Sequence, residues 1–202
     1  GREAYERLAQ LGPTEHNAET VLESGVELPL LDFAEIKAVN DDVVAWLTIP
    51  TLGINYPVVQ GPDNDYYLRR NVERTYNKAG SLFMDYQSSA DLNDAHTIIY
   101  GHNMNDGSMF QPIVGLADQA TFDANRHIIL YTPTKTYLLE TVGVYKTDGS
   151  DKTVRRFDFA DDLDFHNYIQ SKLDESVARD PEVTADSIRH LFTFSTCSYD
   201  VK

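Results

Sequence analysis

One cysteine and one histidine are the residues best suited to chemistry. Cys197 is the only cysteine in the chain of 202 residues, and it ends the strand-like run that begins at Thr193. His102 lies far upstream, in the run Tyr100-Gly101-His102-Asn103. A thiolate is a strong nucleophile, a neighbouring imidazolium stabilises it, and the same histidine can protonate a leaving amine. If the fold brings the two together, the chain has the groups needed for acyl transfer through a thioester.

The thiol also has a structural interpretation. A single cysteine cannot form an internal disulfide, and a buried cysteine often acts only as a small hydrophobic side chain. Residue type alone leaves both interpretations of Cys197 open.

His102 is the strongest of six candidate partners for this thiol. It is expected in a loop, directly after a glycine that ends its strand, and catalytic residues are common in such loops. The histidines expected to be solvated or structural are His16, His166, His127 and His190. His96 lies near Asp91 and Asp94, but the spacing matches no standard zinc or calcium pattern, so no metal site is predicted.

Composition indicates a folded, acidic domain. The chain has 32 acidic and 17 basic side chains, which give a formal net charge of −15. This excess repels a phosphate backbone, so nucleic acid is not an expected partner. The apolar fraction of 42% is typical of a packed domain, and no run of about 18 apolar residues is present. We expect a monomer.

The pattern of apolar residues predicts a mainly β fold. Strand-like runs are expected at 43–49, 54–59, 80–84, 97–100, 127–131, 136–145 and 188–196. Helices are expected at 2–11, 33–39, within 106–125 and at 161–179, the last between the sixth and seventh strands. Short strands with irregular excursions favour a closed β-barrel decorated with helices. The expected division is a helical N-terminal appendage at 1–42 and a β-barrel catalytic domain at 43–202.

Five runs of residues carry a resemblance to a known family. The run Thr193-Phe194-Ser195-Thr196-Cys197 resembles the Thr-Leu-x-Thr-Cys signature of sortases, with Phe194 in place of leucine. The run Tyr100-Gly101-His102-Asn103-Met104 resembles the catalytic-histidine segment of class B sortases. The runs at 56–61, 64–68 and 79–85 also resemble that class, in order and with matching spacing. The similarity extends from about Val43 to Tyr199.

The resemblance implies an activity and a location. Sortases are cysteine transpeptidases that cut a C-terminal sorting signal after threonine, hold the protein as a thioester and pass it to an amine. That amine belongs to a cell-wall peptide crossbridge or to a pilin lysine. The family acts on the outer face of the membrane of Gram-positive bacteria, held by an N-terminal transmembrane segment that is not in the printed sequence, and it needs no cofactor.

The resemblance also implies roles for six residues. Cys197 would be the nucleophile and His102 the general acid. Thr196 and Ser195 would line the site beside the nucleophile. Two further residues, Tyr100 and Asn64, would support the pocket.

One feature of the family is not found in the printed chain. Sortases carry an arginine on the strand after the cysteine, whereas this sequence ends at Lys202. Arg189 and the pair Arg155-Arg156 precede the cysteine and do not match that position. We therefore expect seven of eight barrel strands in this chain, an unpaired sheet edge and weak activity.

Two other functions stay open from the sequence. A plain cysteine peptidase would resolve the thioester with water rather than an amine. A non-catalytic β-barrel surface module would keep Cys197 as a structural residue. Within the sortase interpretation, the sequence does not distinguish cell-wall anchoring from pilus assembly, and it does not specify the sorting motif.

Overall fold

The computed structural model describes residues 5, 8–13 and 30–197. Most of the predicted first helix, most of the connector that follows it and His16 lie outside the described residues, although Tyr5, Leu8 and Ala9 have helical backbone. In the described part of the chain, no helix has both the length and the apolar character required to cross a bilayer.

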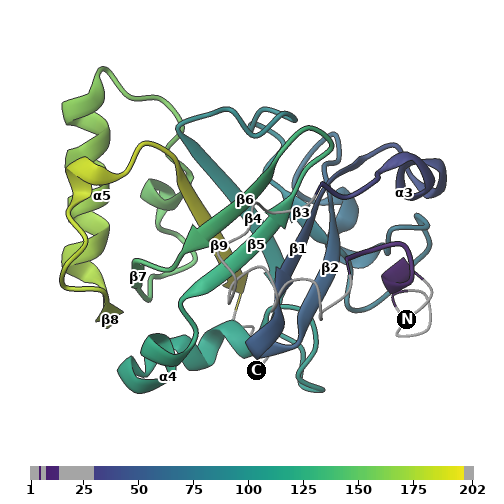
Figure 1. The fold of residues 1–202 in the computed structure, drawn as a ribbon, viewed down its shortest axis with the longest axis horizontal. Helices are drawn as coiled ribbons and strands as arrows, with labels where there is room; N and C mark the ends of the chain where they lie inside the picture. Colours follow the sequence, from purple (N-terminus) through teal and green to yellow (C-terminus); the bar gives the residue numbers. More distant parts are fainter. Residues whose placement is uncertain (1–4, 6–7, 14–29, 198–202) are drawn as a thin grey trace.

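A curled sheet of seven strands forms the body of the protein (Figure 1). Its strands are β1 (Val43–Ile49), β2 (Ile54–Val59), β3 (Leu82–Met84), β4 (His96–His102), β5 (His127–Tyr131), β6 (Thr136–Glu140) and β9 (Leu191–Cys197). Their order across the sheet is β6-β5-β1-β2-β3-β4-β9. Neighbouring strands are antiparallel except for β2 with β3 and β4 with β9, which are parallel. The prediction of a mainly β fold with seven strands in its main sheet is confirmed.

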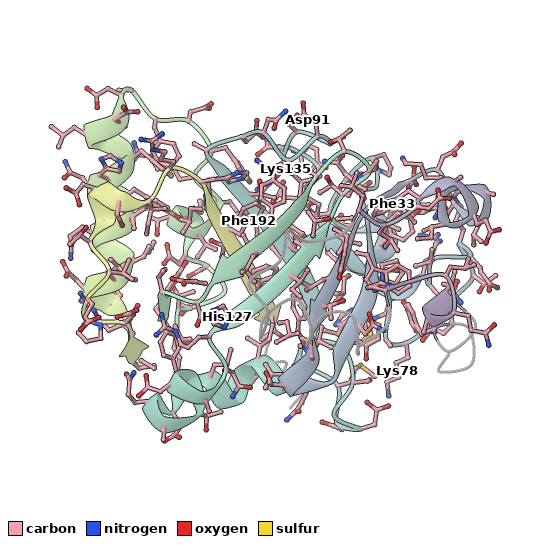
Figure 2. All side chains as sticks on the ribbon, viewed as in Figure 1. Phe33, Lys78, Asp91, His127, Lys135 and Phe192 are labelled. Atoms are coloured by element: carbon pink, nitrogen blue, oxygen red, sulfur yellow. The ribbon has the colours of Figure 1, made fainter. Side chains whose placement is uncertain are left out.

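The barrel is only partly closed within the described residues. Strands β6 and β9 form the two edges of the curled sheet and share no ladder of backbone hydrogen bonds. Side chains bridge part of this gap, since the rings of Tyr137 on β6 and Phe192 on β9 lie 5.3 Å apart between centroids. Figure 2 shows Phe192 where the two strands approach each other. The expectation of full closure is therefore met only roughly.

The sixth predicted strand (136–145) is two strands in the structure. β6 ends at Glu140, and the chain then forms β7 (Gly143–Val144), which pairs with β8 (Ala178–Arg179) in a separate two-stranded sheet. Thr141 donates its N–H to the carbonyl of Arg126, which ends the pairing of β6 with β5. The chain therefore leaves the seven-stranded sheet after Glu140.

Helix α5 (Asp162–Glu175) packs beside this small sheet, at the left of Figure 1. Asp161 caps its N-terminus by accepting a hydrogen bond from the N–H of Asp164 at 2.8 Å. Its buried face consists of Phe165, Tyr168, Ile169, Lys172 and Leu173. The helix is shorter than the predicted range 161–179. Leu163 in its first turn is exposed, and so is Val177 beyond its end.

Short helices complete the fold. They are α3 (Ala34–Val39), α4 (Gln119–Ala124) and the 3-10 helices η1 (Pro50–Leu52), η2 (Tyr66–Arg69), η3 (Gln111–Ala117), η4 (Lys152–Arg155) and η5 (Ala185–Ser187). Both faces of the sheet are covered by hydrophobic clusters. β1 contributes to both, because successive side chains of a strand point to opposite faces. Leu47 lies in the cluster inside the curl, and Trp46 packs outside with Leu8, Phe33 and Ile36.

Gly101 does not end its strand, which corrects the prediction that His102 lies in a loop. β4 continues to His102, since its parallel pairing with β9 extends to that residue. A Cβ at Gly101 would lie 2.6 Å from side-chain atoms of both Leu82 and Phe110. Glycine is needed here for close packing inside the curl rather than for a turn.

We expect Gly101→Ala to destabilise the fold. The added methyl group would displace the buried side chains of Leu82 and Phe110, and overpacking of this kind costs about 1–3 kcal/mol. Urea unfolding measures this change in the free energy of unfolding. Gly149→Ala is the matched control, because a Cβ there meets no atom within 4 Å and should change the free energy by less than about 0.5 kcal/mol. Equal effects of the two substitutions would contradict the packing argument.

Candidate active site

The parallel pairing of β4 and β9 brings the two predicted segments together. In the ladder, His102 is the register partner of Cys197, and Tyr100 is the partner of Ser195. Parallel strands run in the same direction, so the C-terminal ends of β4 and β9 lie at the same edge of the sheet. The histidine and the cysteine that end these strands are therefore neighbours.

A backbone carbonyl holds the imidazole of His102. Only 6% of this residue is exposed, and its Nε2 lies 2.6 Å from the carbonyl oxygen of Leu68. Leu68 belongs to η2, and the last carbonyl groups of a short helix have no partner within that helix. Because a carbonyl oxygen only accepts, Nε2–H must donate. In the neutral ring, Nδ1 is then the nitrogen that can take up or release a proton.

The surroundings of His102 favour its neutral form. Burial lowers its pKa, the charge of Arg69 lowers it further, and the hydrogen bond to Leu68 acts in the opposite direction. The net result is a pKa below the ordinary value of 6.5, so the ring is uncharged at pH 7.

A buried carboxylate lies beside this histidine strand. The side chain of Asp85, just after β3, is fully buried. Its Oδ2 accepts hydrogen bonds from the Tyr100 hydroxyl at 2.5 Å, from Asn64 Nδ2 at 3.1 Å and from Arg155 Nε at 2.7 Å. Burial raises the pKa of Asp85, but the hydrogen bonds from Arg155, Tyr100 and Gln87 outweigh it, so the net pKa is below the usual range. The carboxylate is ionised.

Sequence reasoning missed Asp85 and set Arg155 aside. Arg155 ends η4, and its Nε and Nη2 form a two-point ion pair with Asp85 at 2.7 and 3.1 Å. The hydrogen bond and charge of Asp85 raise the pKa of this guanidinium. Arg155 was rejected because it precedes the cysteine in the chain, and no local pattern marks it. Asp85 lies in one of the runs that carry the family resemblance, which is the only signal that could have identified it.

These residues surround a cavity of about 280 Å³. It is lined by Asn64, Leu68, Phe83, Tyr100, Gly101, His102, Arg155 and Ser195. Four of the six residues predicted for the site, Asn64, Tyr100, His102 and Ser195, thus lie around one cavity.

Thr196 occupies a different position from its neighbour Ser195. Its Oγ1 is buried and has no hydrogen-bond partner among the described residues. Successive positions of a strand alternate between faces, so Thr196 lies on the face of β9 that covers the core.

His96, which the sequence placed near two aspartates, is a structural residue. It is fully buried, its Nδ1–H donates to the carbonyl of Arg156 at 2.7 Å, and its Nε2 lies 2.7 Å from Thr193 Oγ1. Burial lowers its pKa. The described residues include no group of three or more histidine, cysteine, aspartate or glutamate side chains arranged to hold a metal ion.

Comparisons with known proteins agree on one family. The model of the Sortase domain matches residues 47–202. Sortase B of Listeria monocytogenes is 35% identical over 166 residues, which cover 82% of this chain and 67% of that relative. Sortase B of Staphylococcus aureus is 31% identical over the same shares. The solved structure of the Staphylococcus aureus sortase B–substrate complex superposes with a TM-score of 0.82 at 28% identity, over 100% of this chain and 89% of that chain.

The overall fold is therefore shared with a solved sortase B structure. The chain belongs to the sortase family. Within that family its relatives place it in class B, as the five motifs indicated.

We expect Gly80→Ala to disturb His102 through the backbone. Gly80 has a φ of +62°, and a Cβ there would lie 2.4 Å from the Leu68 carbonyl oxygen that accepts from His102. Histidine ¹⁵N NMR should show a changed Nε2 signal, and the free energy of unfolding should fall by more than in the control. Gly53→Ala is that control: its φ is +66° but nothing lies within 4 Å, so only backbone strain of about 1–2 kcal/mol is expected. An unchanged His102 signal in Gly80→Ala would contradict this coupling.

Stability should fall as the pH falls below about 6.5. Folding lowers the pKa of His96 and His102, so the unfolded chain binds more protons than the folded chain once the pH approaches their unfolded value. Their contribution is complete above about 6.5 and is lost as the pH falls through the folded pKa values, at most about 1.4 kcal/mol per pH unit for each histidine. Urea unfolding between pH 7.5 and 5 measures this, since most carboxylates stay ionised in that range. A flat profile would contradict it.

Proposed function

We propose that this protein is a cysteine transpeptidase that cuts a C-terminal sorting signal after threonine and joins the threonine carbonyl to an amine. The observation that carries the proposal is the register of β4 with β9, in which His102 and Cys197 are partners beside a cavity large enough for part of a peptide. The family membership supports the same reaction.

In the first half of the reaction, Nδ1 of the neutral His102 ring takes the proton of the Cys197 thiol. The resulting thiolate attacks the threonine carbonyl carbon and forms a C–S bond. The C–N bond of the scissile peptide then breaks, and its electron pair takes the proton from Nδ1 of His102. Nε2–H remains donated to Leu68 throughout, so the ring keeps its orientation while its charge changes. The lowered pKa of His102 makes the imidazolium a better acid toward the leaving amine.

In the second half, the acceptor amine attacks the thioester carbonyl. Nδ1 of His102 takes a proton from the attacking nitrogen, and the C–S bond breaks to release the thiolate of Cys197. The imidazolium then returns this proton to the thiolate, which restores the neutral histidine and the thiol. The proposed partition between amine and water depends on which nucleophile reaches the thioester, so water alone would give hydrolysis.

The remaining site residues bind the peptide or support the residues that do. Tyr100 donates its hydroxyl hydrogen to Asp85, and burial and this hydrogen bond raise its pKa, so it lines the cavity as a protonated phenol. Asn64 is held on both sides, by Asp85 and by the N–H of Tyr86 at 3.0 Å. We assign Ser195 to the peptide-contacting face of β9 and Thr196 to support of the strand from the core side.

The proposed partners are those of the family. The substrate is the sorting signal of a secreted protein, and the acceptor is a peptidoglycan crossbridge amine or a pilin lysine. The proposed location is the outer face of the membrane of a Gram-positive bacterium, with an N-terminal anchor. The Staphylococcus aureus relative has been solved as a substrate complex, which supports a peptide as occupant of the cavity.

Mass spectrometry after incubation with a library of sorting-signal peptides tests the reaction. We expect an acyl adduct on Cys197, and a new peptide–amine product when a small amine is added. Cys197→Ala should form neither, and His102→Ala should slow transfer by at least about 10²-fold, the usual contribution of a general acid.

His127→Ala is the control for the loss of a histidine, because His127 is exposed at the start of β5 and does not line the cavity (Figure 2). It should react like the unmodified protein. Modification of another residue in place of Cys197, or full activity of His102→Ala, would overturn the proposed roles. Release of acid with no amine product would identify a peptidase instead.

A further inference from the structure

The wall of the cavity contains an ion pair whose partners come from distant parts of the chain. Asp85 follows β3, and Arg155 ends η4. Two N–H groups of the arginine reach both carboxylate oxygens, and Nη2 also lies 3.2 Å from Gln87 Oε1. A planar two-point pair of this kind orients a guanidinium far better than a single contact does.

The paired N–H groups on one edge of the guanidinium therefore fix its orientation. Nε and Nη2 are occupied by Asp85 and Gln87, while Nη1 has no hydrogen-bond partner in the described part of the chain. Arg155 lines the cavity, and its side chain is 40% exposed although that of Asp85 is fully buried. The outer edge of the guanidinium thus has unused donors where a ligand would lie.

Hydrogen bonds hold the backbone on both sides of Arg155. The hydroxyl of Tyr168 on α5 donates to the carbonyl oxygens of Thr153 and Val154 at 2.8 and 3.2 Å. The buried ammonium of Lys172 donates to Thr153 Oγ1 at 2.7 Å, and His96 holds the carbonyl of Arg156. Because residues on both sides of Arg155 are fixed to the body of the protein, its guanidinium keeps one position relative to the cavity.

The pair leaves almost no net charge at this wall. A carboxylate that approached Arg155 would lose its hydration and meet a cation already paired with Asp85. A neutral oxygen, such as a peptide carbonyl or a side-chain amide, loses less hydration and can still accept from Nη1. The geometry therefore favours a neutral acceptor over an anion.

We propose that Asp85 orients the guanidinium of Arg155 and offsets its positive charge. The cavity then binds a neutral hydrogen-bond acceptor of the peptide and discriminates against a carboxylate. Arg155 is the binding residue, and Asp85 is the positioning residue that acts through it. This inference rests on the proposed function only in taking the occupant to be a peptide.

Arg156 offers a matched control for Arg155. It is the next residue, its side chain is also 40% exposed, and it also pairs with a carboxylate, that of Asp164 at 2.5 Å. It contacts the aromatic rings of Phe159 and Tyr168, and it is not among the residues that line the cavity. The two arginines have similar exposure and similar ion pairs, but only Arg155 lines the cavity.

Paired peptides test the inference in a Cys197→Ala background, where binding is measured without turnover. Each pair carries glutamine or glutamate at one of the three positions before threonine and is otherwise identical, and fluorescence anisotropy gives both Kd values. With Asp85 and Arg155 intact, we expect the glutamine peptide to bind more tightly than the glutamate peptide at one of these positions. Asp85→Asn should shift the ratio of Kd values toward glutamate by about tenfold, the scale of one hydrogen bond to a charged group.

Further variants connect the shift to the arginine. Arg155→Met should weaken binding of the glutamine peptide, and Arg155→Met combined with Asp85→Asn should abolish the shift. Arg156→Met should leave both Kd values unchanged. A general loss of structure would weaken binding of both peptides equally. The ratio of Kd values therefore distinguishes a positioning role of Asp85 from a purely structural one.

Each remaining outcome decides the inference. It is overturned if a folded Asp85→Asn chain keeps the original ratio, if the shift persists in the double variant, or if neither peptide binds at millimolar concentration. If Asp85→Asn does not fold, Arg155→Met decides alone, and unchanged Kd values overturn the inference. Selective binding by the Cys197→Ala chain together with no adduct in the unmodified protein would instead overturn the proposed reaction and leave this inference intact.

Discussion

The parallel contact between β4 and β9 is the constraint on which the site depends. Two adjacent strands can be parallel only if the chain between them crosses back over the sheet, which a short turn cannot do. Here the connection contains β5, β6, the small β7–β8 sheet and α5. His102 and Cys197 become neighbours only when that whole connection has folded. The excursion through α5 is thus part of how the site is assembled.

The same connection also delivers the cationic wall of the cavity. η4 lies between β7 and α5, and α5 fixes it through Tyr168 and Lys172. An ionised carboxylate as deeply buried as Asp85 is costly unless its oxygens are paired and hydrogen-bonded. Its donors come from three separate segments, represented by Asn64, Tyr100 and Arg155. The requirement to satisfy one buried charge therefore fixes the relative positions of the cavity walls.

Sequence reasoning selects candidate residues whose chemistry is visible in their type. Cys197 and His102 were proposed because a lone thiol and a loop-like histidine segment are unusual. The mainly β fold was predicted correctly because short apolar runs repeat along the chain. Gly101 was wrongly predicted to end its strand, because the sequence does not distinguish a glycine required for packing against Phe110 from a glycine required for a turn. Arg155 was set aside for a different reason: an ion pair between distant parts of the chain leaves no local pattern in the sequence.

The hydrogen bond of His102 explains why part of such a site cannot be predicted from the types of side chain in the sequence. Its acceptor is the backbone of Leu68, which every residue type would supply at that position. What the sequence must provide is the path of the chain there. Gly80 packs against that carbonyl with no room for a side chain, and the Tyr5 hydroxyl donates to the carbonyl of Gly80 from the N-terminal helical segment. Burial raises the pKa of Tyr5 to about 12, so this donor stays protonated. The orientation of the histidine is thus supported by residues far from it in the sequence, and Tyr5 of the N-terminal segment contributes through its contact with the backbone of Gly80.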